Sequence, residues 1–224
     1  MGYTFSPTSL ALLRECPRCF WLKFKKRIKR PDIIFPTLPS GMDKILKEHF
    51  DKFMRKGILP PELAELDGEV KLFDNEELLN LWRNQFKGIR WTDPEGNTFM
   101  GAIDNLLVKG NKLIVLEYKT RGHPVKDNTH AYFQDQIDIY NLLLRLNGYQ
   151  TEDYAYILFY YPNKVQEQTG DINFHRHLSK VKVSIENAKK IFSKATTLLK
   201  QQNPPAPNPT CQFCDWVEKC RCEI

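Results

Sequence analysis

Long apolar runs are missing from this sequence. No stretch approaches the roughly 20 apolar residues that a membrane-spanning helix needs, and Met1-Gly-Tyr-Thr-Phe5 lacks the pattern of a signal peptide. No helicase motif or recognisable partner domain is present either. We therefore expect a cytosolic protein that has no membrane partner.

The size and composition fit one folded domain. The chain has 224 residues, of which 42% are hydrophobic, and this is enough for one core. We expect a single domain over residues 1–224, which includes a helical N-terminal region and a cysteine tail at 203–224. The net charge of +6 is compatible with a polyanionic partner, but such a balance is common and decides little.

Six cysteines stand out in a chain expected to be cytosolic. Thiols stay reduced in that compartment, so the cysteines favour ligation of a metal or cluster over disulfides. Cys211, Cys214 and Cys220 lie within ten residues and leave a tetrahedral set one ligand short, which Cys16 or Cys19 would supply. The spacing alone is compatible with either a zinc site or an iron–sulfur cluster.

Residues 99–118 are predicted to form a β-hairpin. Two runs rich in β-branched and apolar residues, 99–108 and 112–118, flank a two-residue Gly110-Asn111 turn. If Lys109 pairs with Lys112, Asp104 lies directly opposite Glu117. Opposed carboxylates destabilise a sheet, and a divalent cation held between them would reverse that effect.

The positions next to Glu117 follow from strand alternation. Lys119 shares the face of Glu117, and Tyr118 points to the other face. Lys119 would therefore reach a water or phosphate oxygen at the same metal ion.

The remaining pattern predicts helices around a sheet. Ser6 and Pro7 are typical of a helix start. The other elements expected from apolar spacing are helices over 42–56, 76–86 and 129–146, a buried strand over 154–161, an edge strand over 174–183, and a last helix capped by Ser184. The strand that follows helix 129–146 suggests a crossover connection.

Together these motifs resemble the PD-(D/E)XK nuclease superfamily. Asp104 followed by Glu117-Tyr118-Lys119 is similar to its core, and Gln136-x-x-x-Tyr140 resembles a motif of its RecB-type branch. The terminal cysteines, including the Cys16-Pro-Arg context, resemble the iron–sulfur staple of the CRISPR-associated exonuclease and of AddB-type nucleases. The resemblance extends from about Ser6 to Cys220.

The resemblance implies a fold and a set of site residues. The fold is an α/β, restriction-endonuclease-like mixed central sheet flanked by helices, with an iron–sulfur staple joining the N- and C-terminal regions. Mg²⁺ or Mn²⁺ would be held by Asp104, Glu117 and the Tyr118 carbonyl, and Lys119 would complete the catalytic set. Gln136 and Tyr140 would contact DNA.

The cluster ligands implied by the resemblance are Cys16, Cys211, Cys214 and Cys220. We expect them to bind a [4Fe-4S] cluster, with zinc as the alternative.

One family feature is missing. RecB-type nucleases place a metal-binding histidine in the first core helix, four residues after a glycine, whereas here Gly41 is followed at that distance by Ile45. Asp43 and His49 are the nearest candidates to replace it, and neither is in register.

The function expected from these residues is metal-dependent hydrolysis of DNA. The resemblance adds exonuclease action on single-stranded ends, in DNA repair or CRISPR adaptation, where protein partners are expected. The alternatives are a catalytically weak DNA-binding or scaffold protein with a zinc or iron–sulfur tail, and a structure-specific endonuclease. The sequence does not fix the oligomeric state.

Overall fold

The computed structural model describes the backbone of residues 2–31 and 37–223, with side chains through residue 221. The chain divides into two compact units. Unit 1 contains residues 1–34, 91–100 and 186–224, and unit 2 contains residues 35–90 and 101–185. The two units do not decide whether the chain folds as one domain, so the single domain over 1–224 stays a prediction.

Unit 2 is built on a five-stranded mixed sheet in the order β2-β5-β6-β7-β8. The strands are β2 (Lys71–Leu72), β5 (Asn105–Lys109), β6 (Lys112–Thr120), β7 (Tyr154–Val165) and β8 (Ile172–Lys182). Strands β6 and β7 are parallel, and the other pairs are antiparallel. The parallel pair confirms the predicted crossover, because α5 lies between these strands in the chain.

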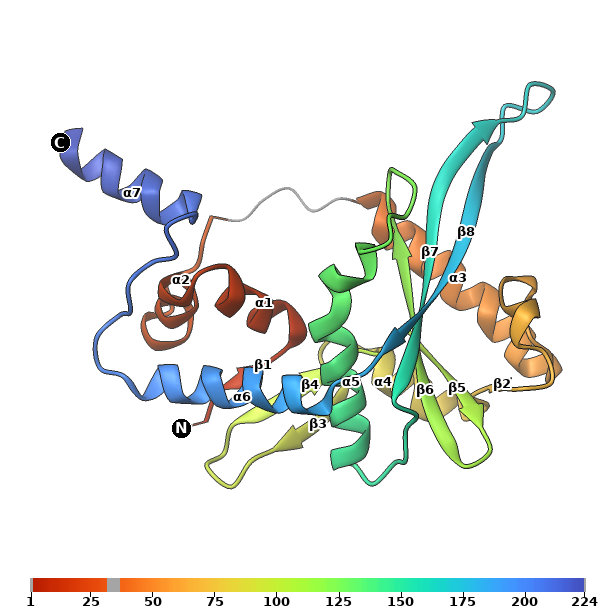
Figure 1. Ribbon diagram of the computed structural model, residues 1–224, viewed down its shortest axis with the longest axis horizontal. Coiled ribbons are helices and arrows are strands. Elements are labelled where there is room, and N and C mark those ends of the chain that lie inside the picture. The colour runs from red at the N-terminus through yellow and green to blue at the C-terminus, as the bar shows by residue number, and fades with distance from the viewer. Residues whose placement is uncertain (1, 32–36, 224) are drawn as a thin grey trace. The chain divides into compact units, whose positions relative to one another are not determined.

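Helices cover the sheet of unit 2. Figure 1 shows α3 (Thr37–Lys56) and α5 (Gln134–Leu146) on opposite faces. Strand alternation explains which residue faces which helix. Tyr118 packs on Phe50 of α3, with ring centroids 4.7 Å apart, whereas Glu117 faces α5 and accepts a hydrogen bond from Gln136. Tyr118 therefore points away from the face of Glu117, as predicted.

The shorter elements of unit 2 connect these layers. They are the 3₁₀ helix Pro61–Leu66, α4 (Glu76–Arg83) and the 3₁₀ helix Thr129–Phe133.

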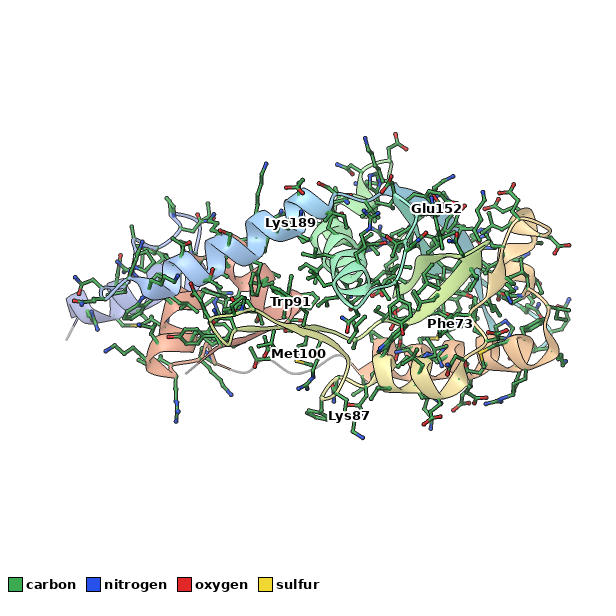
Figure 2. The ribbon with its side chains drawn as sticks, turned by 90° about the horizontal axis from the view of Figure 1, so that it is seen from below. Phe73, Lys87, Trp91, Met100, Glu152 and Lys189 are labelled. Atoms are coloured by element: carbon green, nitrogen blue, oxygen red, sulfur yellow. The ribbon has the colours of Figure 1, made fainter. Side chains whose placement is uncertain are left out.

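Unit 1 contains both ends of the described chain. Its sheet has the order β1-β4-β3. Its elements are β1 (Thr4–Phe5), α1 (Pro7–Glu15), α2 (Pro17–Trp21), a π-helical turn (Leu22–Lys26) and α7 (Gln212–Glu223). It also contains most of β3 (Ile89–Thr92), β4 (Thr98–Gly101) and α6 (Ile185–Lys200), whose residues 89–90, 101 and 185 belong to unit 2. Figure 2 labels Trp91 and Met100 on β3 and β4.

An aromatic core holds unit 1 together. Phe5 of β1 packs against Phe20 of α2 and Phe192 of α6, with ring centroids 6.0 and 5.7 Å apart. Phe99 of β4 stacks on Phe192 at 4.9 Å. The start of α1 follows the prediction, because Ser6 accepts a hydrogen bond from Ser9 N in a capping box and Pro7 is the first helical residue.

The predicted strand 99–108 is divided in the structure. Its first part is β4 and its second part is β5, in different sheets, with 102–104 between them. Gly101, the last residue of β4, comes close to the ring of Tyr140: a Cβ added at Gly101 would lie 2.7 Å from that ring. The register of the hairpin is nevertheless as predicted, since Lys109 pairs with Lys112 and Asn105 with Leu116.

Three helices differ from their predicted ranges. Helix α3 begins at Thr37, five residues before the predicted start at residue 42. Helix α4 ends at Arg83, three residues before the predicted end, so Phe86 lies outside it and is 75% exposed, whereas Leu79 and Trp82 of the helix are buried. The predicted helix 129–146 begins with a 3₁₀ turn. This turn changes the side-chain spacing, and Tyr132 is 85% exposed.

Candidate active site and cysteine site

The β5–β6 hairpin of unit 2 brings Asp104 to Glu117. Its turn depends on Gly110, which has a φ of 59°, a left-handed conformation that glycine adopts without strain. Asp104 directly precedes β5, and its Oδ2 accepts a hydrogen bond of 3.1 Å from the backbone N–H of Tyr118. The two acidic residues are therefore held at the same end of the hairpin.

Glu117 is a buried carboxylate with incomplete pairing. It is 2% exposed. Its Oε1 accepts hydrogen bonds from Lys119 Nζ at 2.6 Å and Gln136 Nε2 at 2.8 Å, while its Oε2 has no partner. Burial and the neighbouring charge of Asp104 raise the pKa of Glu117 to about 8, against the opposing effect of Lys119. This carboxylate would gain from a further cation.

Helix α3 contributes a lysine that sequence reasoning missed. Lys47 Nζ lies 2.9 Å from Asp104 Oδ1 and 2.8 Å from Asp43 Oδ2. Burial lowers the pKa of Lys47, but the carboxylates of Asp104 and Asp43 outweigh it and leave that pKa raised. Lys47 thus stays charged and links Asp43 to the site.

Arg83 at the end of α4 holds the backbone of Asp104 in place. Its Nε donates to the Asp104 carbonyl at 2.7 Å, and its Nη1 donates to both carboxylate oxygens of Asp51 at 2.8 and 2.9 Å. The sequence contains a signal for Asp51 and Lys47: with Asp43 they recur every four residues of α3 and form a polar stripe. Arg83 comes from another element and gives no such signal.

Gln136 and Tyr140 both face this site from α5. Gln136 Nε2 donates to Tyr140 Oη at 2.7 Å as well as to Glu117. Tyr140 is 4% exposed. Burial, followed by the charge of Glu117, raises the pKa of Tyr140 well above its usual value. Gln136 is thus fixed between a buried phenol and a buried carboxylate.

Of the two candidates for the missing helix histidine, only Asp43 is linked to the acidic pair. His49 Nε2 lies 3.2 Å from Glu62 Oε2, and its ring packs on Phe53 at 4.9 Å between centroids. Asp43 reaches Asp104 through Lys47.

These residues provide the chemistry of a divalent-cation site. Asp104, Glu117 and the neighbouring Asp43 supply hard oxygen ligands, which Mg²⁺ and Mn²⁺ prefer. The unpaired Oε2 of Glu117 and its raised pKa fit such an ion, because a bound cation would satisfy that atom and favour the charged carboxylate.

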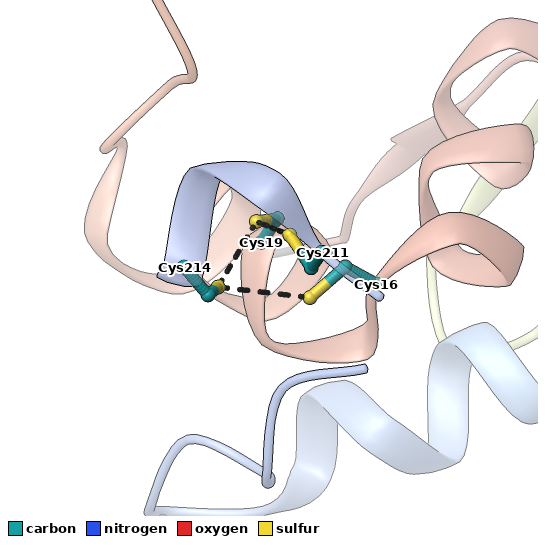
Figure 3. A group of neighbouring side chains, drawn as sticks. All are labelled: Cys16, Cys19, Cys211 and Cys214. Atoms are coloured by element: carbon teal, nitrogen blue, oxygen red, sulfur yellow. Dashed lines mark hydrogen bonds between the residues drawn. The ribbon is translucent and has the colours of Figure 1, made fainter. Parts of the chain in front are cut away.

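A second site lies in unit 1, where four cysteines point toward one another (Figure 3). Cys16 and Cys19 come from the start of α2, and Cys211 and Cys214 from the start of α7. Their Sγ atoms lie within 4.8 Å of one another. The group joins the N- and C-terminal regions of the chain and can bind a metal ion or cluster.

The cysteine group differs from the predicted set at one position: it contains Cys19, and Cys220 is not a member among the described residues. The tail was expected to bring three cysteines to one point, but α7 is a helix from Gln212 to Glu223. Six helical residues move Cys220 about 9 Å along the axis from Cys214 and to another side. Cys19 lies one helical turn after Cys16 and faces the group.

Comparison with known proteins identifies the family. The family model of the PD-(D/E)XK nuclease superfamily matches residues 4–221. The chain therefore belongs to this superfamily. Membership suggests a nuclease, and the activity that it implies is that of a metal-dependent phosphodiesterase. No curated protein matches the chain.

The described residues include no helix that is both long and apolar enough to span a membrane.

Proposed function

We propose that this protein is a Mg²⁺- or Mn²⁺-dependent deoxyribonuclease whose catalytic residues are Asp104, Glu117 and Lys119. The observation that carries the proposal is the buried Glu117 carboxylate beside Asp104, with one oxygen unpaired. Lys119 and Lys47 offset part of the cost of burying these two acids, but the unpaired oxygen of Glu117 still costs stability unless a further cation binds. A site that retains this cost fits a catalytic function better than a structural one.

Each residue has a role that follows from its contacts. Asp104, Glu117 and the Tyr118 carbonyl would hold the divalent ion, which when bound polarises the scissile phosphate and lowers the pKa of its water. Lys119 donates to Glu117 at 2.6 Å, and its ammonium can orient the attacking water or stabilise developing negative charge.

The surrounding residues position this set. Lys47 and Arg83 fix the side chain and the backbone of Asp104. The resemblance gives Gln136 and Tyr140 a role in contacting DNA. Tyr140 is buried, so it would act through its hydrogen bond with Gln136, and the bond from Gln136 to Glu117 would couple substrate binding to the orientation of the carboxylate.

The finer parts of the proposal come from the resemblance to RecB-type nucleases. They are exonuclease action on single-stranded DNA ends, a cytosolic location, and work with protein partners in DNA repair or CRISPR adaptation. The resemblance also implies an iron–sulfur cluster at the cysteine group. The four Sγ atoms lie within 4.8 Å of one another, however, and this spacing favours a ligand smaller than such a cluster.

The test is cleavage of labelled DNA with Mg²⁺, Mn²⁺ or EDTA. The substrates are single- and double-stranded DNA with free or blocked ends. We expect Asp104→Ala, Glu117→Gln and Lys119→Ala each to reduce the rate by about 10²-fold or more, because each removes a metal ligand or a charge stabiliser. The control Lys109→Ala, at the exposed turn of the same hairpin, should keep the wild-type rate.

The outcomes separate the alternatives. Cleavage of blocked or circular DNA would replace the exonuclease with an endonuclease. DNA binding without cleavage under any metal would support the scaffold alternative, and a wild-type rate in Glu117→Gln would overturn the proposed catalytic set.

A further inference from the structure

The four cysteines of unit 1 form two half-sites of the same local design. Cys16 is the N-cap of α2 and Cys19 is its third residue. Cys211 directly precedes α7, and Cys214 is the third residue of that helix. A hydrogen bond closes each turn: Phe20 N donates to the Cys16 carbonyl at 3.1 Å, and Asp215 N donates to the Cys211 carbonyl at 3.0 Å.

The sulfurs of the two half-sites are too far apart for disulfides and close enough to share one ion. The Sγ of Cys214 lies 3.8 Å from that of Cys16 and 3.7 Å from that of Cys19, and the Sγ atoms of Cys19 and Cys211 are 3.7 Å apart. A disulfide requires about 2.05 Å. In a tetrahedral zinc site with bonds of about 2.3 Å, the sulfurs stand about 3.8 Å apart.

A four-iron cluster needs a wider set of sulfurs. Each thiolate of such a cluster binds a different iron at a corner of the cube, so the irons lie between the sulfurs and hold them apart. Four sulfurs within 4.8 Å of one another leave no room for that cube. The geometry therefore disagrees with the cluster that the family resemblance implies.

We propose that Cys16, Cys19, Cys211 and Cys214 bind a single Zn²⁺ ion in a closed tetrahedral site. Four thiolates and one Zn²⁺ carry a net charge of −2. The positive charge of Arg30 offsets part of this negative charge, because its Nη2 donates to Cys211 Sγ at 3.6 Å. Its guanidinium also lies over the ring of Phe213, 4.5 Å from the ring centroid. Outer-sphere donors of this kind orient thiolate ligands.

The closed set assigns the ion a structural role. All four positions of the tetrahedron are taken by protein sulfurs, and no position is left for a water or substrate. The ion would join segments of the chain that are 198 residues apart in the case of Cys16 and Cys214. It would stabilise unit 1 and take no part in hydrolysis.

The first test is elemental analysis of full-length protein, made with both iron and zinc in the medium and purified without oxygen. We expect a colourless protein with about one zinc per chain and no more than traces of iron. A brown protein with about four irons and acid-labile sulfide per chain would overturn the proposal. Metal content is measured without a cleavage assay, so the nuclease proposal can fail or hold independently.

The second test identifies the ligands. Protein loaded with Co²⁺ in place of Zn²⁺ should show the intense visible bands of a tetrahedral tetrathiolate site. Cys19→Ser should lose these bands or shift them, and the matched control Cys220→Ser should keep both the bands and the zinc. The opposite pattern, with zinc lost in Cys220→Ser and kept in Cys19→Ser, would overturn the ligand set.

If Cys19→Ser fails to fold, a third measurement uses Cys19→His instead. Cys19→His preserves a tetrahedral zinc site with three sulfurs and one nitrogen but is a poor substitute in a [4Fe-4S] cluster. We expect this variant to retain about one zinc per chain with an altered Co²⁺ spectrum. An unchanged Co²⁺ spectrum would show that residue 19 is not a ligand.

Discussion

At the scale of single residues, the buried acid of the β6 strand makes stability depend on pH. The pKa of Glu117 is raised to about 8 by burial and by Asp104, whereas in the unfolded chain it should lie near 4.3. The native state therefore holds a proton that the unfolded state has lost. The contribution of Glu117 to the free energy of unfolding is therefore fully present below about pH 4 and is lost as the pH rises toward 8.

We predict that metal-free protein becomes less stable between about pH 5 and 8. The expected loss attributable to Glu117 is on the order of a few kcal/mol, measured by urea unfolding in EDTA at a series of pH values. Glu117→Gln cannot ionise and should flatten this part of the profile. An equally steep decline in that variant would show that another group is responsible.

The sequence predicts the residues of the hairpin better than those around it. Asp104 directly precedes β5, and Glu117 and Lys119 lie on its partner strand β6, so alternation and turn length fix which of these side chains meet. Lys47 and Arg83 reach Asp104 from helices distant in the chain. Their positions depend on how those helices pack, which no local pattern specifies.

At the scale of elements, the differences from prediction occur where tertiary contacts end a regular pattern. Residues 99–108 are rich in apolar residues, but β4 ends at Gly101 and β5 begins at Asn105 in a different sheet. Likewise, a helical pattern continues past Arg83, where the chain instead leaves α4. Periodicity identifies which elements exist, while packing determines where they end.

The close approach of Gly101 to Tyr140, both in unit 2, gives a prediction about packing. Gly101→Ala should destabilise the protein by about 1–3 kcal/mol, because the new Cβ would lie 2.7 Å from the buried ring of Tyr140. The measurement is chemical unfolding in the presence of Mg²⁺. The variant should also cleave more slowly, since Tyr140 bonds Gln136 and Gln136 bonds Glu117.

Gly41→Ala is the matched control for this substitution. Gly41 lies within α3, and a Cβ there would have nothing within 4 Å. Because alanine favours a helix interior over glycine, this change should leave stability unchanged or raise it by up to about 1 kcal/mol. Equal losses in both variants would contradict the proposed role of the contact with Tyr140.

At the scale of the whole molecule, the charge is unevenly divided. Unit 1 has 14 Lys and Arg against 8 Asp and Glu, whereas unit 2 has 19 of each. Unit 1 therefore carries the whole excess of +6. The net charge of the sequence could not locate a binding surface for a polyanion, because the fold is needed to assign each charged residue to a unit.

Part of the excess positive charge of unit 1 lies on α6. Lys189, Lys190 and Lys194 are exposed and line a shallow hollow of that helix, and Figure 2 labels Lys189. Exposed lysines grouped in this way can neutralise the phosphates of a nucleic acid and release counterions. On the proposed function, we expect this face to bind the DNA backbone without reading its sequence.

The corresponding prediction concerns salt. Replacing Lys189, Lys190 and Lys194 together by alanine should reduce the slope of log K against log salt by about 2 on single-stranded DNA, since each lost phosphate contact removes roughly 0.7. Binding would be measured by fluorescence anisotropy in EDTA, which prevents cleavage. The control replaces Lys44, Lys52 and Lys56, exposed lysines of α3 in the neutral unit. Because both variants lose three positive charges, a general effect of net charge would lower both slopes equally and would contradict the assignment of DNA binding to α6.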